Sequence, residues 1–245
     1  MKTIIFLLGI VFLTTNFTHA QGWQDKLKEA KNKATGGGTG SGLTNDEIIA
    51  GLKEALSVGA RNGAGLASKA DGYYKNTLIF IPFPPEAIKV KNAAEKVGMK
   101  GKVDEFIMTM NHAAEEAAKE AADVFITAVK GMSVSDGMKI LKGADNAATE
   151  YLKSSTSSEL NQKFTPIVKS ATQKVQVTKY WEPLINNYNK ASLLTGGEKI
   201  NPDLDAYITD KAIEGLFKLI AQEEAKIRKD PVARVSEILK KVFGM

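Results

Sequence analysis

The sequence contains no cysteine among its 245 residues. Disulfide bonds, thiolate metal sites and thiol catalysis are therefore excluded, and so is the modified cysteine that carries the lipid of a lipoprotein. Histidine is nearly as scarce, because only His19 and His112 are present. A fold without disulfides must be held together by packing alone.

Long hydrophobic runs are also rare. One stands at the N-terminus, where Lys2 precedes the apolar residues 4–13, and a small-x-small pattern follows at residues 18–20. This order predicts a secretory signal peptide, residues 1–20, cleaved after Ala20. The alternative is an N-terminal membrane anchor, but a span needs about 20 apolar residues. No later segment approaches that length, so we expect a periplasmic protein, with secretion as the alternative.

The charge of the mature chain is close to balanced. The whole sequence has 33 basic and 28 acidic residues, and the signal peptide holds one of the lysines and no acid. A small positive excess that is spread evenly fits a solvated surface better than a nucleic-acid footprint. We therefore expect no nucleic-acid partner.

Residues 21–42 differ from the rest of the chain. They begin as a lysine-rich lead and end in GGGTGSG, residues 36–42. No Gly-Lys-Ser/Thr closes this run, so it reads as a flexible linker and not as a phosphate loop. The folded domain is expected to cover residues 43–244.

The first helix of this domain has a clear start. Thr44 to Glu47 form a capping box, and apolar residues then recur at spacings of three and four. Glycines cost helix stability, so several on one helix predict that another helix crosses close to its backbone. These glycines are Gly51, Gly59, Gly63 and Gly65.

The remaining pattern is helical almost throughout, with no convincing strand. We expect an all-α, single-domain multi-helix bundle with one extended Pro-rich crossover segment. Two interruptions are predicted, a bend near Asp123 and a break at Pro166, and a second capping box is expected at Thr156 to Glu159. The expected helices cover residues 85–98, 102–131, 135–141, 146–153, 156–175, 180–190, 202–229 and 232–243.

The crossover, TLIFIPFPPE (residues 77–86), is called the strap below. Its prolines fix their own φ and push the preceding residues out of the helical region. We expect the strap to lie pinned across the bundle; a mobile gate or a docking edge is the alternative. If it is pinned, Leu78→Asp should destabilise the fold. The residues expected to hold it are Leu78, Ile79, Ile81 and Phe83.

Several segments together resemble the bacterial domain-of-unknown-function family 4197. They are LTNDEIIAGLKEALSVGA, LIFIPFPPE, DEFIMTMNHAAEEAA, KGADNAATEYLKSSTSSEL and DAYITDKAIEGLFKLIAQEEAKIRKDPVARVSEILKKVFG. The resemblance implies an exported helical protein of Gram-negative bacteria and no established activity. Members often have Arg where this chain has His112, and Gly-Asp-Thr where it has residues 144–146, so no catalytic residue is carried over.

Few residues could carry chemistry. His112 is the sole imidazole of the mature chain, so the paired histidines of a zinc peptidase or a di-iron bundle are missing. There is no Gly-x-Ser-x-Gly elbow. Asp203 to Glu214 faintly resembles a calcium loop, but Ile208 stands where the loop needs glycine. We therefore predict no metal, no cofactor and no catalytic residue.

Polar residues among alanines are the best candidates for a site. A polar group in such surroundings must find a partner, and Arg61 or Arg228 could meet an acid. These polar residues could form a buried structural network or a cluster that orients a ligand. The aromatic residues could line an apolar cleft or fill the ends of the bundle. The candidate ligand-binding residues are Tyr73, Tyr74, Phe83, Asn111, Glu115, Asp145, Thr149 and Arg228.

Three functions are consistent with these features. The first is a non-catalytic binding module for an apolar small molecule, a lipid or a partner helix, with an envelope protein as a possible partner. The second is a hydrolase of envelope glycan or lipid that uses carboxylates such as Glu115 and Asp145. The third is a structural or stress-protective envelope factor that needs no pocket.

Overall fold

The computed structural model describes residues 44–229 except 175–176, 197–198 and 202. This part of the chain is all-α, as predicted, and contains no strand. The predicted segments 1–20, 21–42 and 232–243 lie outside the described residues. The elements are α2 (Asn45–Ser68), the 3₁₀ turn η1 (Pro85–Ala87), α3 (Ile88–Lys96), α4 (Lys100–Ala118), α5 (Ala121–Gly131), α6 (Val134–Lys142), α7 (Ala147–Lys174), α8 (Val177–Thr195) and α9 (Leu204–Lys229).

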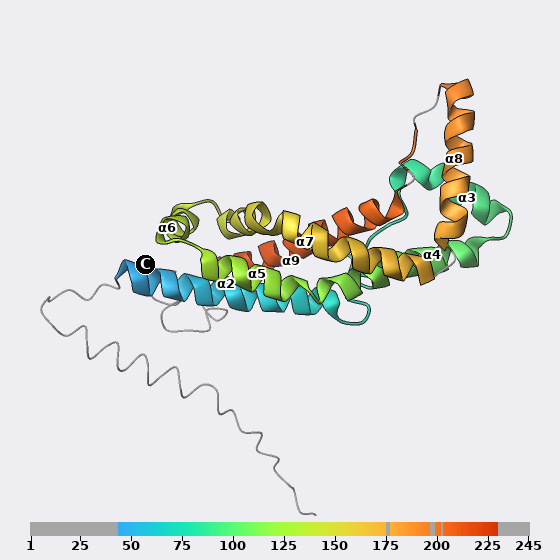
Figure 1. Cartoon of the computed structure of the whole chain (residues 1–245). Coiled ribbons are helices and arrows are strands. Elements are labelled where there is room, and N and C mark those ends of the chain that lie inside the picture. The colour runs from blue at the N-terminus through green and yellow to red at the C-terminus, as the bar shows by residue number, and fades with distance from the viewer. Residues whose placement is uncertain (1–43, 175–176, 197–198, 202, 230–245) are drawn as a thin grey trace, which may run out of the picture. The chain divides into compact units, whose positions relative to one another are not determined.

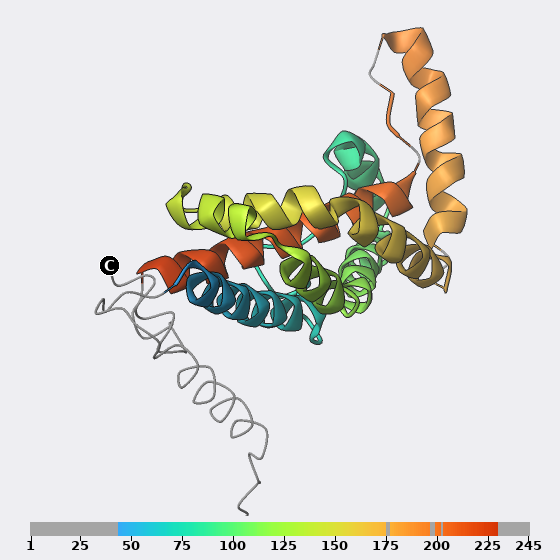
Figure 2. The ribbon, with the colours of Figure 1, turned by 60° about the vertical axis from the view of Figure 1, so that its left-hand side comes forward.

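Helix α9 is the central element of the bundle. It packs along α2, α4 and α7 (Figure 1), and the second view shows α2, α5 and α7 gathered around it (Figure 2). Contacts between α7 and α9 join residue 149 to residue 224 and residue 172 to residue 205, so the two helices run antiparallel. No described helix is long and apolar enough to cross a membrane.

Gly59 and Gly63 of α2 mark the crossing with α9, as predicted, whereas a Cβ added at Gly65 meets nothing within 4 Å. A Cβ added at Gly63 would lie 3.1 Å from Ile220 Cδ1 and 3.6 Å from the Ile220 backbone nitrogen. At Gly59 it would lie 3.5 Å from Glu223 Cβ. The start of α2 is also as predicted, because Thr44 and Glu47 exchange both hydrogen bonds of a capping box.

The strap is non-helical between residues 80 and 84, and every second residue faces the core. Ile79, Ile81 and Phe83 are buried. Leu78 is 39% exposed, so its predicted role as a core residue is wrong, and Leu78→Asp is not expected to unfold the protein. Leu78 precedes the extended residues and lies in a turn, in which the N–H groups of Ile79 and Phe80 donate to the Asn76 carbonyl oxygen, and its side chain is directed outward there.

The structure differs from the prediction at two helix boundaries in the middle of the chain, those expected at Thr156 and Pro166. Helix α7 runs unbroken through Thr156 and Pro166. The Thr156 hydroxyl donates to the Leu152 carbonyl oxygen inside the helix (2.6 Å), so it opens no capping box. Leu160 and Phe164 bury one face of α7 next to Pro166, and this packing outweighs the lost backbone bond.

The predicted bend of the long helix is a full break. It separates α4 from α5 at Lys119 and Glu120, just before the expected position at Asp123. The start of α9 is capped by Asp203, whose Oδ1 accepts the Ala206 N–H at 2.9 Å. The segment that faintly resembles a calcium loop is therefore the capped start of a helix.

A close approach between the strap and α9 gives the first prediction. A Cβ at Gly215 would lie 2.8 Å from the ring of Tyr73 and 3.1 Å from Ile79 Cβ, whereas one at Gly65 meets nothing within 4 Å. We expect Gly215→Ala to lower the free energy of unfolding by about 1 to 3 kcal/mol through overpacking. The matched change Gly65→Ala should raise it by up to about 1 kcal/mol. Urea unfolding of both variants checks this, and equal stabilisation by both would contradict it.

Candidate functional site

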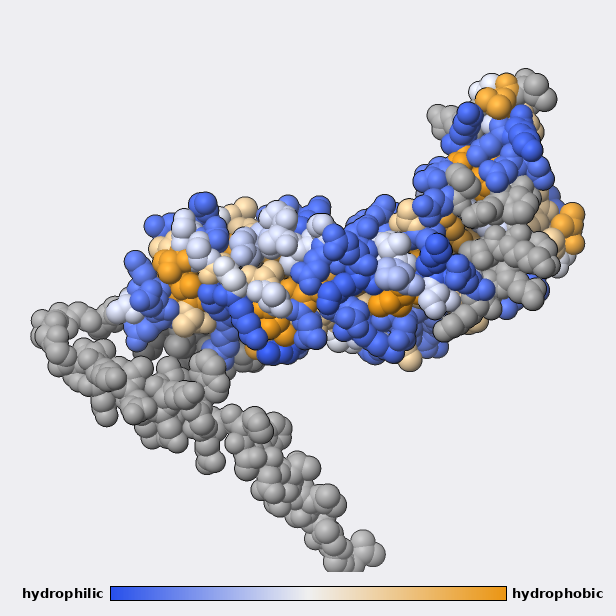
Figure 3. All heavy atoms as spheres, viewed as in Figure 1, coloured by the Kyte–Doolittle hydropathy of each residue, from blue (hydrophilic) through white to orange (hydrophobic). Residues whose placement is uncertain are grey.

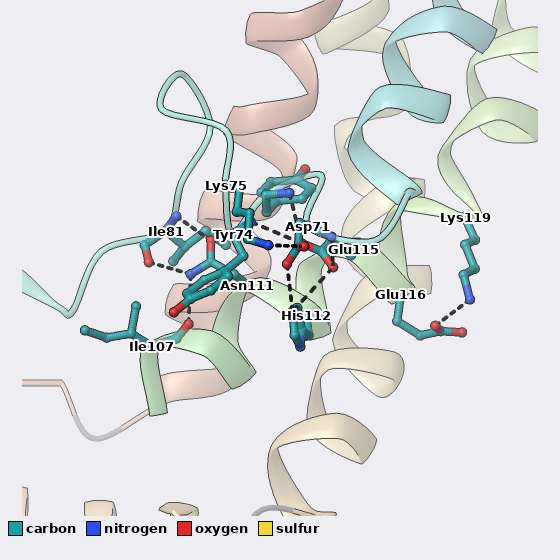
Figure 4. Close-up of polar contacts among 11 residues, drawn as sticks. Asp71, Tyr74, Lys75, Ile81, Ile107, Asn111, His112, Glu115, Glu116 and Lys119 are labelled. Atoms are coloured by element: carbon teal, nitrogen blue, oxygen red, sulfur yellow. Dashed lines mark hydrogen bonds and ion pairs between the residues drawn. The ribbon is translucent and has the colours of Figure 1, made fainter. Parts of the chain in front are cut away.

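The turn after α2 is held by a buried carboxylate. α2 ends at Ser68, and Asp71 takes a positive φ of 59°, so that several N–H groups of the turn point the same way. Glu115 on α4 accepts three of them, from Asp71 (3.2 Å), Tyr73 (3.0 Å) and Tyr74 (3.1 Å). Figure 4 shows the carboxylate facing this turn. The role of Glu115 is therefore to cap backbone.

One turn earlier on α4, Asn111 holds the strap. Its Oδ1 accepts the Ile81 N–H at 2.8 Å, and its Nδ2 donates to the Ile81 carbonyl oxygen at 2.9 Å and to the Ile107 carbonyl oxygen at 2.8 Å. The side chain is fully buried. Asn111 pairs with the strap as a neighbouring β-strand would, so the strap is pinned in this structure.

His112 lies at the edge of this site and is half exposed. Its Nε2 is 3.6 Å from Asp71 Oδ1, and its ring meets Tyr74 edge-on with centroids 5.7 Å apart. Lys75 pairs with Asp71 at 2.8 Å. The hydrogen bond from Lys75 first, and then that from His112, lowers the pKa of the Asp71 carboxyl. His112 thus belongs to a surface cluster of charges.

Tyr73 fills the space between the turn and α9. Its side chain is fully buried, and its hydroxyl donates to the Ala212 carbonyl oxygen at 2.6 Å. Burial first, and then the charge of Glu115, raises the pKa of this phenol. Tyr207 performs a similar task from α9, because its hydroxyl donates to the Pro82 carbonyl oxygen of the strap at 3.1 Å.

A second buried carboxylate closes the opposite end of the bundle. Glu224 on α9 accepts the N–H groups of Ala148 and Thr149 at the start of α7 (3.0 and 2.8 Å) and the Thr149 hydroxyl (2.7 Å). Arg228 donates to Glu224 through Nε and Nη2, and Nη2 also reaches the Ile140 carbonyl oxygen at the end of α6. This network joins three helices.

The candidate residues therefore fall into separate places and form no common site. Asn111, Glu115 and Tyr73 belong to the strap region, and Thr149 and Arg228 to the Glu224 network. Phe83 packs with Phe106 and Trp181 in a buried aromatic cluster, while the Asp145 side chain is 82% exposed and Arg61 is exposed on α2.

The arginine prediction is therefore correct for Arg228, which pairs with Glu224. Among the described residues, neither Glu115 nor Asp145 pairs with an arginine, although Asp145 lies 4.0 Å from Lys229. Among the described residues, no group of three potential metal ligands comes together.

An open groove lies between α7 and α9, and we call it the α7–α9 groove. Its volume is about 490 Å³. Ile213, Phe217 and Ala221 form its floor at intervals of four residues, and polar side chains form both margins. The lining residues are Asn146, Thr149, Glu150, Lys153, Ser157, Asn161, Asp210, Ile213, Glu214, Phe217, Lys218 and Ala221.

A family model for proteins of unknown function, DUF4197, matches residues 42–244. The chain belongs to the DUF4197 family. This confirms the resemblance found in the sequence. No curated protein matches the chain, and neither does any solved structure.

Sequence reasoning missed two further interactions of this DUF4197 protein. Asn189 on α8 exchanges both backbone hydrogen bonds with Ile200 (2.7 and 2.8 Å), in the manner of Asn111. The second interaction is the network around Glu224. The spacing of four residues between Glu224 and Arg228 was the available signal for an ion pair, but nothing local indicates that Glu224 caps α7.

Glu115 gives the second prediction. Glu115→Gln replaces one accepting oxygen by an NH₂ group, which cannot accept the N–H groups of the turn. We expect this change to lower the free energy of unfolding by about 3 kcal/mol, since hydrogen bonds to a buried charge are lost. Glu116→Gln is the matched control, because Glu116 is exposed and pairs with the exposed Lys119. Chemical denaturation should show a change within about 0.5 kcal/mol for the control, and equal effects would argue against the capping role.

The partly buried phenol of Tyr207 gives a pH prediction. Burial raises the pKa of Tyr207 from 10.0 to about 12. A raised folded-state pKa favours the neutral form, so this contribution is fully present below pH 10 and is lost as the pH rises toward 12. We expect the stability of the wild type to fall more steeply between pH 10 and 12 than that of Tyr207→Phe. Urea midpoints across this range test it, and parallel curves would refute it.

Proposed function

We propose that this DUF4197 protein is an exported, non-catalytic interaction protein that binds a helix of a partner protein in the α7–α9 groove. The observation that carries the proposal is the groove itself. Two antiparallel helices form its walls, and their lining residues recur at intervals of three and four. A third helix packs naturally against such a pair of walls.

The size of the groove suits a helical occupant. Its α7 margin extends from Asn146 to Asn161, which corresponds to about 22 Å at the helical rise. A helix of about 15 residues would cover that length. Along the floor, Ile213, Phe217 and Ala221 offer an apolar line to the apolar stripe of an amphipathic partner.

The charges at the margins favour a partner with charges of both signs. Glu150 and Lys153 stand on the α7 margin, and Glu214 and Lys218 on the α9 margin. Glu214 and Lys218 are 2.8 Å apart. Mixed charges beside an apolar line are typical of the flanking positions at which packed helices select their partners.

The other ligands considered fit less well. An apolar small molecule needs an enclosed apolar cavity, and the hollows described at the α7–α9 groove and at residues 69–77 are both open and partly polar. The hypothesis of a structural factor that needs no pocket does not account for the α7–α9 groove. We therefore favour the partner helix.

The hydrolase hypothesis lacks a suitable pair of carboxylates. Glu115 accepts three backbone N–H groups, and Asp145 lies exposed at the other end of the bundle. In the groove, hydrogen bonds from Lys211 and Lys218 lower the pKa of Glu214 to about 2. Glu214 is thus ionised near neutral pH and cannot act as the general acid of a glycosidase.

Site-specific cross-linking tests the proposal. A photoreactive amino acid at Ser157, which lines the groove, should cross-link in the native host to one helical segment of a partner. The same group at the adjacent Ser158, outside the groove, should not. A synthetic peptide of that segment should bind the purified protein, and Ser157→Trp should weaken the binding at least tenfold whereas Ser158→Trp should not.

Three outcomes would overturn this function. They are an adduct of carbohydrate or lipid mass at Ser157, a cross-link to residues 232–243 of this chain, or equal labelling at both positions. The location is tested separately. N-terminal sequencing of protein from a periplasmic extract should begin at Gln21, and recovery only from the cytoplasm would contradict export.

A further inference from the structure

The connection between α3 and α4 exposes two apolar side chains next to one another. Val97 is 74% exposed and Met99 is 49% exposed, and Val97 has the highest exposure among the large hydrophobic residues described. Gly98 between them has a φ of +84°, which turns the chain sharply at this point. Single exposed apolar residues are common on soluble proteins. Here two of them are separated only by Gly98, so exposed apolar surface is concentrated at this turn.

This turn stands clear of the rest of the described protein. A Cβ added at Gly98 or Gly101 would meet nothing within 4 Å. Helix α3 has no fully buried residue, and its hydrophobic residues Val90 and Ala94 are partly buried against the core. Figure 1 shows the α3–α4 connection at the right-hand edge, and Figure 3 shows hydrophobic atoms at the same edge.

Lysines surround the two apolar residues. Residues 96–102 read KVGMKGK, which we call the α3–α4 tip, and α3 adds Lys89 and Lys91. Residues 88–102 thus contain five lysines and one acid, Glu95. Ion pairs join Lys91 to Glu95, and Lys100 and Lys102 to acids at positions 104 and 105 further along α4. The pairs on α4 are exposed and contribute little, so these lysines can exchange them for other anions.

We infer that the α3–α4 tip docks this protein on the surface of an anionic lipid bilayer. Val97 and Met99 enter the boundary between headgroups and acyl chains, and the lysines contact lipid phosphates. Basic residues beside exposed apolar ones are the combination that binds anionic membrane surfaces. The long aliphatic part of each lysine side chain can enter the lipid beside Val97 and Met99, while its ammonium group stays in the headgroup layer.

A bilayer suits this surface better than a protein partner does. A stable protein interface buries about 800 Å² on each side and requires complementary shape. Two apolar side chains at one turn provide far less area, but insertion into fluid lipid requires no complementary shape. The tip is separate from the α7–α9 groove, so this inference does not depend on the proposed function.

The absence of cysteine allows a local test in the full-length chain. An environment-sensitive fluorophore is attached to a single cysteine in V97C, or in the control V134C, since Val134 is 46% exposed on α6. Each labelled protein is mixed with vesicles of phosphatidylcholine alone or with 30% phosphatidylglycerol. Because the fluorophore reports its own surroundings, lipid binding by residues 4–13 does not imitate a signal at position 97.

We expect the label at 97, and not at 134, to shift to the blue and to be shielded from an aqueous quencher on anionic vesicles. Replacing Lys96, Lys100 and Lys102 by Gln should lower the apparent vesicle affinity at least fivefold, while Gln at the exposed Lys130, Lys139 and Lys142 should not. The inference is wrong if the label at 97 stays in water, if both labels respond alike, or if the response depends on protein concentration without lipid, which would show self-association.

Discussion

The arrangement of the first half of this protein depends on one anion, the carboxylate of Glu115. It is buried, yet it faces three backbone N–H groups of the turn that follows α2. Those groups satisfy the charge, since a buried carboxylate is tolerated only when it is well hydrogen-bonded. The same interaction fixes the direction in which the chain leaves α2. It therefore places Tyr73 against α9 and the strap along α4, where Asn111 forms hydrogen bonds with the strap.

The opposite end of the bundle uses the same chemistry with one addition. Glu224 caps the start of α7 from another helix, and Arg228 supplies a cation within the network. A helix N-terminus attracts negative charge, and here the charge comes from α9, a different part of the chain. The oxygens of Glu115 are occupied by backbone N–H groups, and Asp145, the other carboxylate named for the hydrolase hypothesis, is exposed at the opposite end of the bundle. The two acids therefore do not face each other as that hypothesis requires.

Local signals predicted local structure well. The capping box at Thr44, the prolines of the strap and two glycines of α2, Gly59 and Gly63, each act through neighbouring backbone or through close contact, and each has the expected effect. The capping box proposed at Thr156 was wrong because the hydroxyl found an acceptor within its own helix. The backbone partners of Glu115 and Glu224 could not be predicted, because they lie 41 to 76 residues away and only the tertiary fold brings them together.

Asn111 and Glu115 contact the main chain of the segments that they hold, and not the side chains. Evolution can therefore alter the strap and the turn residue by residue, within limits of volume and backbone conformation, without disturbing these hydrogen bonds. The two holding positions have no such freedom, since no other residue type offers the same donors and acceptors at the same reach. Sequence divergence within such a fold should thus be unequal on the two sides of each contact. Asn111 and Glu115, whose side chains make the hydrogen bonds, should be constrained, and the residues whose main chain they contact should be variable.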